Sequence, residues 1–198
     1  MSFTAQSGPQ SGPHSGSHAC TPSQTVGPFF SLGLGPWYRD ELGNLRASGR
    51  THVRGRVLDA EGQPIPDAVL ELWQADLNGR YAHGRDPRNN PDFCGFGRVA
   101  TDAGGGFRFS TTKPGQVPGP NSMLLQAPHL NVLVSMRGLL KPVRTRMYFP
   151  NEASNAHDPV LALVPETRRA SLIASIEPEA LRWDIRMRGP LETVFFEY

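Results

Sequence analysis

Glycine and proline interrupt this chain so often that long helices are not expected in it. The 198 residues include 21 glycines and 19 prolines, together about a fifth of the chain. Glycine weakens a helix and proline breaks it, whereas both are preferred in tight turns. The stretches between them are short, and several alternate between apolar and polar residues. This combination predicts many short strands joined by turns.

The clearest alternation lies in the sequence HLNVLVSMR, residues 129–137. Leu130, Val132, Val134 and Met136 share one face, because successive side chains of a strand point to opposite sides. Further runs that predict strands occupy residues 53–57, 69–75, 145–149, 181–187 and 193–198.

Two other local signals complete the predicted fold. The glycine-rich stretch at residues 102–106, between RVAT and FRFS, predicts a β-hairpin, and residues 166–174 after Pro165 predict one short helix. We therefore predict an all-β fold: an antiparallel β-sandwich of about eight strands, with long loops and that single short helix.

The composition changes twice along the chain. Residues 1–20 are Ser, Gly, Pro, Gln and His with almost nothing apolar, so we expect a disordered tail. Residues 21–50 begin with TPSQTVGPFFSLGLGPWY, which fits neither a helix nor a strand period. We interpret this part as an irregular arm that lies against its own domain or a partner. Residues 51–198 then contain the predicted sandwich domain.

Charge, hydropathy and cysteine content exclude several classes of protein. Lysine and arginine total 20 against 18 acidic residues, a net charge of +2 without a basic block, so no nucleic-acid partner is expected. No run approaches the roughly 18 apolar residues of a membrane span, and no apolar leader is visible, so we expect a cytoplasmic protein without membrane contact. Cys20 and Cys94 predict no disulfide scaffold. Cys94 is interpreted as a small loop residue, with a reactive thiol as the alternative.

The residues alone leave the chemistry open. The sequence contains no P-loop, no GxGxxG, no GxSxG, no HExxH and no paired CxxC motif. His129, Asn131 and Arg137 project from the face of the predicted strand opposite its apolar row. An imidazole, an amide and a guanidinium there can line a site, but they can equally be a hydrogen-bonded strand histidine and surface residues.

A family resemblance narrows these possibilities. Six segments in order resemble the intradiol ring-cleaving dioxygenases: TPSQTVGPFF, ELWQADLNGRYAH, FGRVATDAGGGFRFSTTKPG, APHLNVLV, TRMYF and RWDIRMRGPLETVFFEY. The match covers residues 21–198 and is closer to the alpha chains of the two-chain enzymes in this family. The resemblance implies an oxidoreductase subunit. The holoenzyme would use O₂ to cleave 3,4-dihydroxybenzoate between its hydroxyls, giving 3-carboxy-cis,cis-muconate.

The same resemblance implies that the iron site is incomplete. In catalytic chains of the family, two tyrosines and two histidines hold non-haem ferric iron. Tyr81 and His129 match one of each, whereas Val117 lies at or next to the second tyrosine position and Asn131 at the second histidine position. Gln126 falls roughly where catalytic chains have an arginine that assists the reaction. Because ferric iron is a hard ion that needs anionic ligands, we expect this chain to bind no cofactor, with Tyr81 and His129 as structural remnants.

The resemblance also implies a partner. A homologous beta chain would carry the Fe(III), and alpha–beta pairs would assemble into a larger hetero-oligomer. In this family the N-terminal segment of the alpha chain approaches the partner's active site. Thr25 and Pro28 would therefore line the entrance for the aromatic substrate and O₂. Arg137 would place a positive charge near the substrate carboxylate, since a guanidinium pairs with a carboxylate through two hydrogen bonds.

Two alternatives from other classes stay open. One is a self-sufficient metalloenzyme with an unrelated ligand set, such as Tyr81, His83 and Asp92, although loop ligands without ordered spacing favour it little. The other is a stand-alone β-sandwich binding module without an enzymatic role. Stoichiometric iron in the chain purified alone would favour the first, and co-purification with a beta chain would argue against the second.

Overall fold

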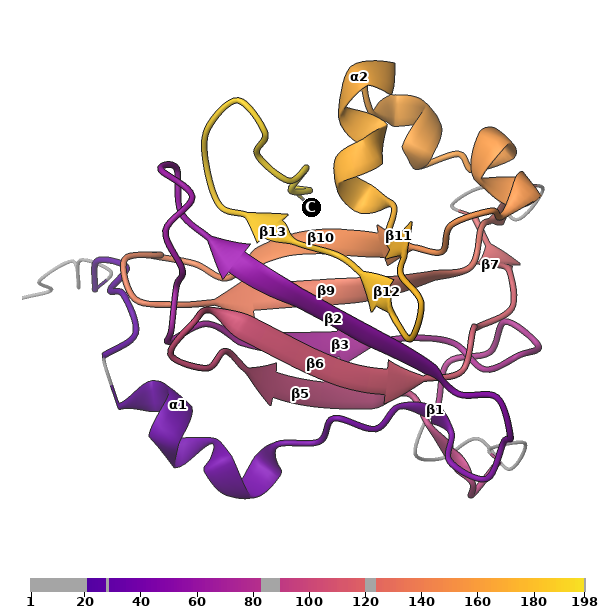
Figure 1. Ribbon diagram of the computed structural model, residues 1–198, viewed down its shortest axis with the longest axis horizontal. Helices are drawn as coiled ribbons and strands as arrows, with labels where there is room; N and C mark the ends of the chain where they lie inside the picture. Colours follow the sequence, from indigo (N-terminus) through magenta and orange to yellow (C-terminus); the bar gives the residue numbers. More distant parts are fainter. Residues whose placement is uncertain (1–20, 28, 83–89, 120–123, 198) are drawn as a thin grey trace, which may run out of the picture.

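Two β-sheets facing each other form the body of the protein (Figure 1). The computed structural model describes residues 21–27, 29–82, 90–119 and 124–197. Their strands are β1 (Gly43–Asn44), β2 (Thr51–Leu58), β3 (Val69–Trp73), β4 (Phe93–Cys94), β5 (Phe96–Ala100), β6 (Gly106–Thr111), β7 (Val117–Pro118), β8 (Leu125–Gln126), β9 (His129–Ser135), β10 (Val143–Tyr148), β11 (Ser175–Ile176), β12 (Leu181–Arg182) and β13 (Ile185–Arg186).

The sheet around β9 has the order β10-β9-β3-β5, and all its neighbours are antiparallel. The sheet around β2 pairs antiparallel with β6 on one side of that strand. On the other side, β12 and β13 pair with β2 in the parallel direction, and β11 extends β12. Two small two-stranded sheets, β1-β4 and β7-β8, lie outside these layers. The prediction of an all-β sandwich is confirmed, with the two parallel pairings as the exception to its antiparallel order.

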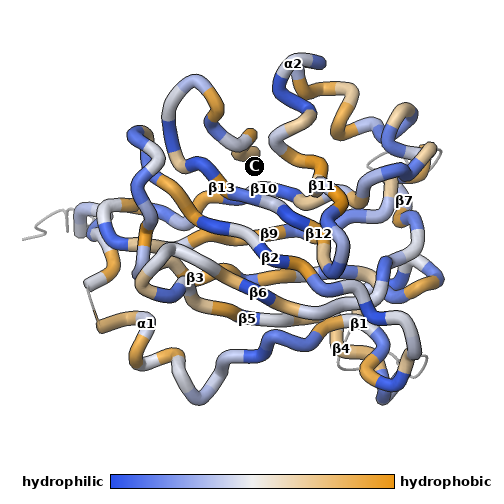
Figure 2. The backbone as a smooth tube through the Cα atoms, in the orientation of Figure 1, coloured by the Kyte–Doolittle hydropathy of each residue, from blue (hydrophilic) through white to orange (hydrophobic). Residues whose placement is uncertain are grey.

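The core lies between the two sheets and follows the predicted alternation. Leu130, Val132 and Val134 of β9 are buried, whereas Asn131, Leu133 and Ser135 on the other face are partly exposed. Burial of such an apolar row is the main favourable contribution to folding. Figure 2 shows hydrophobic residues along the strands and a mostly hydrophilic α2. The opposite sheet contributes Val53, Val57, Phe107, Phe109 and Ile185 to the same core.

The predicted hairpin at residues 102–106 is wrong, although the turn itself forms. Asp102 accepts hydrogen bonds from the amides of Gly104 and Gly106, and Gly105 adopts a positive φ of 70°. However, β5 pairs with β3, whereas β6 pairs with β2. The turn therefore carries the chain from one sheet to the other. A local turn signal does not reveal which strands its two arms will pair with.

The predicted strand over residues 181–187 is divided into β12 and β13. Between them, the Asp184 carboxylate accepts the hydrogen bond from the Arg56 amide at 2.9 Å, in place of a backbone carbonyl. The backbone of Trp183 approaches β2 so closely that a Cβ on Gly55 would lie 1.8 Å from its carbonyl oxygen, which only glycine permits. The run at 193–198 also forms no strand within its described part, residues 193–197, apart from an isolated bridge between Phe196 and Arg144.

Helical segments in the described ranges are short. The expected helix after Pro165 is found as α2 (Glu166–Arg169), continued by a 3₁₀ turn at Ala170–Leu172. The other elements are α1 (Phe30–Gly33) and 3₁₀ turns at Gly35–Trp37, Ala153–His157 and Leu161–Leu163. No helix in the part of the chain that the structure describes has the length and hydropathy needed to cross a membrane.

Candidate functional site

Strand β9 places two of the four ligand positions, His129 and Asn131, on the outer face of its sheet, beside β10. His129 lies directly opposite Tyr148, and Asn131 lies opposite Arg146. Directly opposite residues share one face of an antiparallel pair, so these four side chains project to the same side. The elements that follow β10 cover this end of the sheet, where Tyr148 is packed in an apolar cluster with Ala127, Leu161, Val164 and Leu172.

His129 is buried, with 3% of its surface exposed, and its protonation state follows from its contacts. Its Nδ1 lies 2.7 Å from the Ala127 carbonyl oxygen, which can only accept, so Nδ1 carries the proton. Burial lowers the pKa of the imidazole to about 4, and the nearby charge of Arg146 acts in the same direction; the bond to Ala127 and the charge of Asp158 oppose this shift. His129 is therefore a neutral, hydrogen-bonded core residue at neutral pH.

The other three ligand positions, Tyr81, Val117 and Asn131, also make contacts within the chain. The Asn131 side-chain amide donates a hydrogen bond to the Tyr81 hydroxyl at 3.0 Å. Val117 is 4% exposed and pairs with Gln126 between β7 and β8. The structure thus joins Tyr81 to Asn131 directly, and it makes Val117 a buried hydrocarbon in a small sheet.

A polar network beside these residues was not predicted from the sequence. Arg146 donates from Nη1 to the side-chain oxygen Oε1 of Gln126 at 2.6 Å, and Nε2 of Gln126 in turn donates to the Pro118 carbonyl at 2.8 Å. The Tyr148 hydroxyl donates to Asp158 at 3.2 Å. Burial is the main factor that raises the pKa of the Tyr148 phenol. The resemblance implies an arginine near position 126 in catalytic chains. Here a guanidinium does lie next to Gln126, but it belongs to Arg146 of β10.

Asp158 anchors this network to the backbone. Its carboxylate is buried and accepts hydrogen bonds from the amides of Ala127, Val160 and Leu161 at 2.7–2.8 Å. Charge-assisted bonds of this kind are among the stronger ones in proteins. The sequence contains a pattern from which two residues of this network could have been predicted. Arg146 and Tyr148 alternate in the run that predicts a strand over 145–149, so period two places them on one face.

The donor set does not fit the four-ligand ferric shell that the family resemblance implies. Val117 has no donor atom, and the Asn131 side chain directs its amide NH₂, a hydrogen-bond donor, at Tyr81. Tyr81 and His129 leave one phenol and one imidazole, and Arg146 adds a permanent positive charge beside them. Within the described ranges, no three His, Cys, Asp or Glu side chains come together as metal ligands.

Thr25 and Arg137 lie together at the other end of β9. The backbone amide of Gly138 donates to the Thr25 hydroxyl at 2.8 Å, and Arg137 forms an ion pair with Asp67. Because β9 ends at Ser135, the expectation that Arg137 continues the His129 face is wrong; it belongs to the turn that follows. The two ends of β9 are about 20 Å apart, given the rise of a strand. Pro28 lies outside the described residues.

Of the three residues of the alternative metal site, the structure describes Tyr81 and Asp92, and the Tyr81 hydroxyl accepts the hydrogen bond from Asn131. Asp92 forms an ion pair with Arg46 at 2.9 Å, and His83 lies outside the described residues. Cys94 is buried. Its thiol donates to the Phe96 carbonyl and accepts from Arg39, both at 3.0 Å, which favours a structural role. Cys20 also lies outside the described residues.

A cavity of about 360 Å³ adjoins Asn131 on the outer face of the β9 sheet. Its volume falls in the range of small-ligand sites. It is lined by Trp73, Asn131, Val132, Leu133, Arg144 and Thr145.

A family described as Dioxygenase matches residues 39–189. The chain belongs to the intradiol ring-cleaving dioxygenase family, which is iron-dependent, and the resemblance found in its sequence is confirmed.

Comparison with individual proteins gives more specific matches than the family does. The protocatechuate 3,4-dioxygenase alpha chain of Burkholderia cepacia is 44% identical over 196 residues, covering 89% of this chain and 96% of its own length. The beta chain of that enzyme from the same organism is 37% identical over 175 residues, covering 79% of this chain and 74% of its own. The structure of 3-chlorocatechol 1,2-dioxygenase from Rhodococcus opacus 1CP matches with a TM-score of 0.59 at 23% identity. It covers 74% of this chain and 63% of that chain, and this likeness shows the fold alone.

Proposed function

We propose that this chain is the alpha chain of a protocatechuate 3,4-dioxygenase and does not itself perform the chemistry. It pairs with a homologous beta chain that carries the Fe(III), in a larger hetero-oligomer of alpha–beta pairs. The pair cleaves 3,4-dihydroxybenzoate with O₂ to 3-carboxy-cis,cis-muconate. The observation that carries the proposal is the loss of donors at Val117 and Asn131 inside an intact family fold. The near full-length identity to an alpha chain supports it.

The contacts of the remnant residues favour a structural role for them. His129 bonds to the Ala127 carbonyl, and the Asn131 amide bonds to the Tyr81 hydroxyl. Buried polar groups are stable only when they are hydrogen-bonded, so a site that loses its metal must satisfy its side chains internally. The network around Arg146 and Asp158 meets this need.

Thr25, Pro28 and Arg137 are proposed to contribute to the partner's substrate site. Arg137 supports this because 56% of its side chain is exposed despite the ion pair with Asp67. Its guanidinium has further N–H groups for a substrate carboxylate. Thr25 is exposed, and its bond to Gly138 holds the arm beside Arg137. A purely structural role for Arg137, through Asp67, is the competing account.

The N-terminal arm, residues 21–50, is proposed to dock on the beta chain, whereas residues 1–20 are proposed to be a dispensable tail. Phe29, Leu32 and Trp37 are 74%, 71% and 68% exposed, and α1 contains no buried residue. Exposed aromatic clusters of this kind are typical of protein interfaces. Residues 51–198 are proposed as the sandwich domain that carries this arm.

Co-expression with the cognate beta chain tests the proposal. We expect the two chains to co-purify with one iron per pair and to consume O₂ on addition of 3,4-dihydroxybenzoate. The alpha chain purified alone is expected to be colourless, with no stoichiometric iron and no O₂ uptake. Iron near one per chain in the isolated alpha chain, or failure of the two chains to associate, would contradict the proposal.

A further inference from the structure

A second hollow extends from the outer face of β2 and β6 to residues 98–100 of β5, at the edge of the other sheet, and shares no lining residue with the first cavity. Its volume is about 970 Å³. Arg54, Arg56, Arg98, Arg108 and Arg182 line it, and we call it the arginine groove. Four of the five lie on β2, β6 and β12 of one sheet, whereas Arg98 belongs to β5 of the other sheet and forms an ion pair there with Glu71 at 2.5 Å.

The strand register brings these arginines together. Val53 and Val57 of β2 face the core, so Arg54 and Arg56 project outward between them. Arg54 lies directly opposite Arg108 of β6 on one side and beside Arg182 of β12 on the other. Like charges directly opposite each other destabilise a sheet. The charges of this row therefore require carboxylates, either from this chain or from a ligand.

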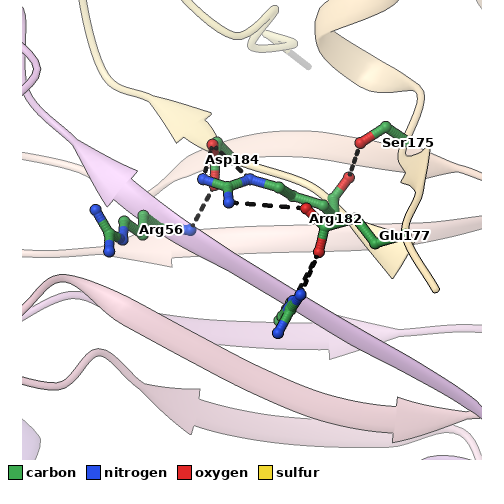
Figure 3. Close-up of polar contacts among 6 residues, drawn as sticks. Arg56, Ser175, Glu177, Arg182 and Asp184 are labelled. Carbon is green, nitrogen blue, oxygen red and sulfur yellow. Dashed lines mark hydrogen bonds and ion pairs between the residues drawn. The ribbon is translucent and has the colours of Figure 1, made fainter. Parts of the chain in front are cut away.

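Part of the charge is matched within the chain. Arg54 pairs with Glu177 at 2.6 Å, and Arg182 pairs with Asp184 at 2.8 Å. Figure 3 shows these carboxylates beside β2, with the Arg182 guanidinium between Asp184 and Glu177. The groove thus already binds carboxylates through its arginines.

Arg56 and Arg108 differ from Arg54 and Arg182, because their guanidiniums are not paired with carboxylates of the described residues. Both side chains are exposed, and no carboxylate among the described residues forms an ion pair with either of them within 4.0 Å. Asp184 contacts Arg56 only through the backbone amide of that residue, and Figure 3 shows the Arg56 side chain directed away from the Asp184 carboxylate. Two open guanidiniums remain on the wall of the groove.

We propose that the arginine groove binds an extended segment of a partner protein that carries carboxylates at alternate positions. Alternate residues of an extended chain lie about 7 Å apart on one side, the same repeat that separates Arg54 from Arg56. A guanidinium can take such a carboxylate through two parallel hydrogen bonds. Tyr38 adds a partly exposed aromatic ring to the lining.

The charge pattern favours an acidic peptide over a nucleic acid. Asp40 and Asp102 also line the groove, and Glu177 and Asp184 stand at its edge. A phosphate backbone carries a charge at every nucleotide and would place some of them against these carboxylates. A peptide with alternate acids places its charges only where the arginines are.

Binding of a synthetic peptide to the full chain tests this proposal. The probe is a fluorescent heptapeptide with Asp at positions 1, 3, 5 and 7 and Val between them, followed by fluorescence polarisation. We expect saturable binding that is lost when the four Asp are replaced by Asn. The Arg56→Ala/Arg108→Ala variant should raise the Kd about tenfold or more. Its thermal midpoint should be unchanged or higher, because Arg108→Ala removes the repulsion with Arg54.

The matched control is Arg80→Ala/Arg188→Ala, which removes two exposed arginines outside the groove. It should leave the Kd within about twofold. An equal loss in both double variants would reduce the effect to net charge and overturn the proposal. Tighter binding of a labelled ten-nucleotide oligothymidylate than of the peptide, or no binding of the peptide to the unaltered chain, would also overturn it.

Discussion

The two ends of β9 differ in how their polar side chains are satisfied. At the His129 end, an imidazole, an amide, a guanidinium and a buried carboxylate bond to groups of the same chain. At the other end, Thr25 and Arg137 lie on exposed segments that other molecules can reach. Under the proposed function, this difference explains how a subunit can lose its metal chemistry and keep its fold. Interior groups must be paired internally, whereas loop groups keep contacts for partners.

The largest expected effect concerns the N-terminal arm, which lies at the Thr25 and Arg137 end of β9. A chain that begins at Asp40 lacks the exposed Phe29, Leu32 and Trp37, so it should lose association with the beta chain altogether. A chain that begins at Thr21 should associate as the full chain does, because residues 1–20 offer almost nothing apolar. Size-exclusion chromatography of the co-expressed chains measures both. Equal association of the two truncations would show that the arm has no role in pairing.

At the His129 end of β9, Asp158→Ala should lower the free energy of unfolding by about 3–5 kcal/mol. The substitution leaves the Ala127, Val160 and Leu161 amides without their buried acceptor. Denaturant titration of the isolated chain gives the value. The control Asp92→Ala breaks a partly exposed ion pair with Arg46 and should cost less than about 1 kcal/mol. Similar losses in the two variants would mean that the Asp158 network is not the anchor described here.

The neutral state of His129 should appear as a pH dependence of stability. Its pKa is about 4 in the folded chain and about 6.5 when unfolded, so the unfolded state binds more protons between these values. Stability should therefore be constant above pH 6.5 on this account and fall by about 3 kcal/mol as the pH drops to 4.

The variant His129→Gln isolates this contribution, because it removes the titration and keeps a donor for the Ala127 carbonyl. Hydrogen bonding to Lys113 lowers the pKa of Glu152 to about 2, so its contribution to stability falls below pH 4.5. Because this loss is the same in both proteins, it cancels in the comparison. Parallel pH profiles of the variant and the parent protein between pH 4 and 6.5 would refute the assignment.

A smaller effect is expected from Arg137→Ala in the assembled enzyme. If Arg137 helps to hold the substrate carboxylate, kcat/KM for 3,4-dihydroxybenzoate should fall about 5- to 150-fold, mainly through KM, a loss of roughly 1–3 kcal/mol. Catechol has no carboxylate and should be affected far less. Asp67→Asn is the control, since it removes the ion pair and keeps the guanidinium. An equal loss for both substrates, or the same loss in Asp67→Asn, would assign Arg137 a structural role.

The sequence predicted one end of β9 better than the other. The alternation of Leu130, Val132 and Val134 predicted the buried face of the strand correctly. The end of the strand at Ser135 was missed, because the alternation continues through Met136 while the chain already turns there. The contact of Gln126 with Arg146 was also missed. It joins residues twenty positions apart, and local patterns do not show which polar side chains will meet across a sheet.

The most direct test of the central claim is the iron content of the alpha–beta pair after Tyr81→Phe. This substitution removes the phenol of the remnant site and keeps the aromatic ring, at the cost of the hydrogen bond from Asn131. If the iron belongs to the beta chain, metal analysis should give one iron per pair in both proteins, with the same phenolate-to-iron absorption band. A clear loss of iron or of that band in Tyr81→Phe would show that this chain holds metal and would contradict the account.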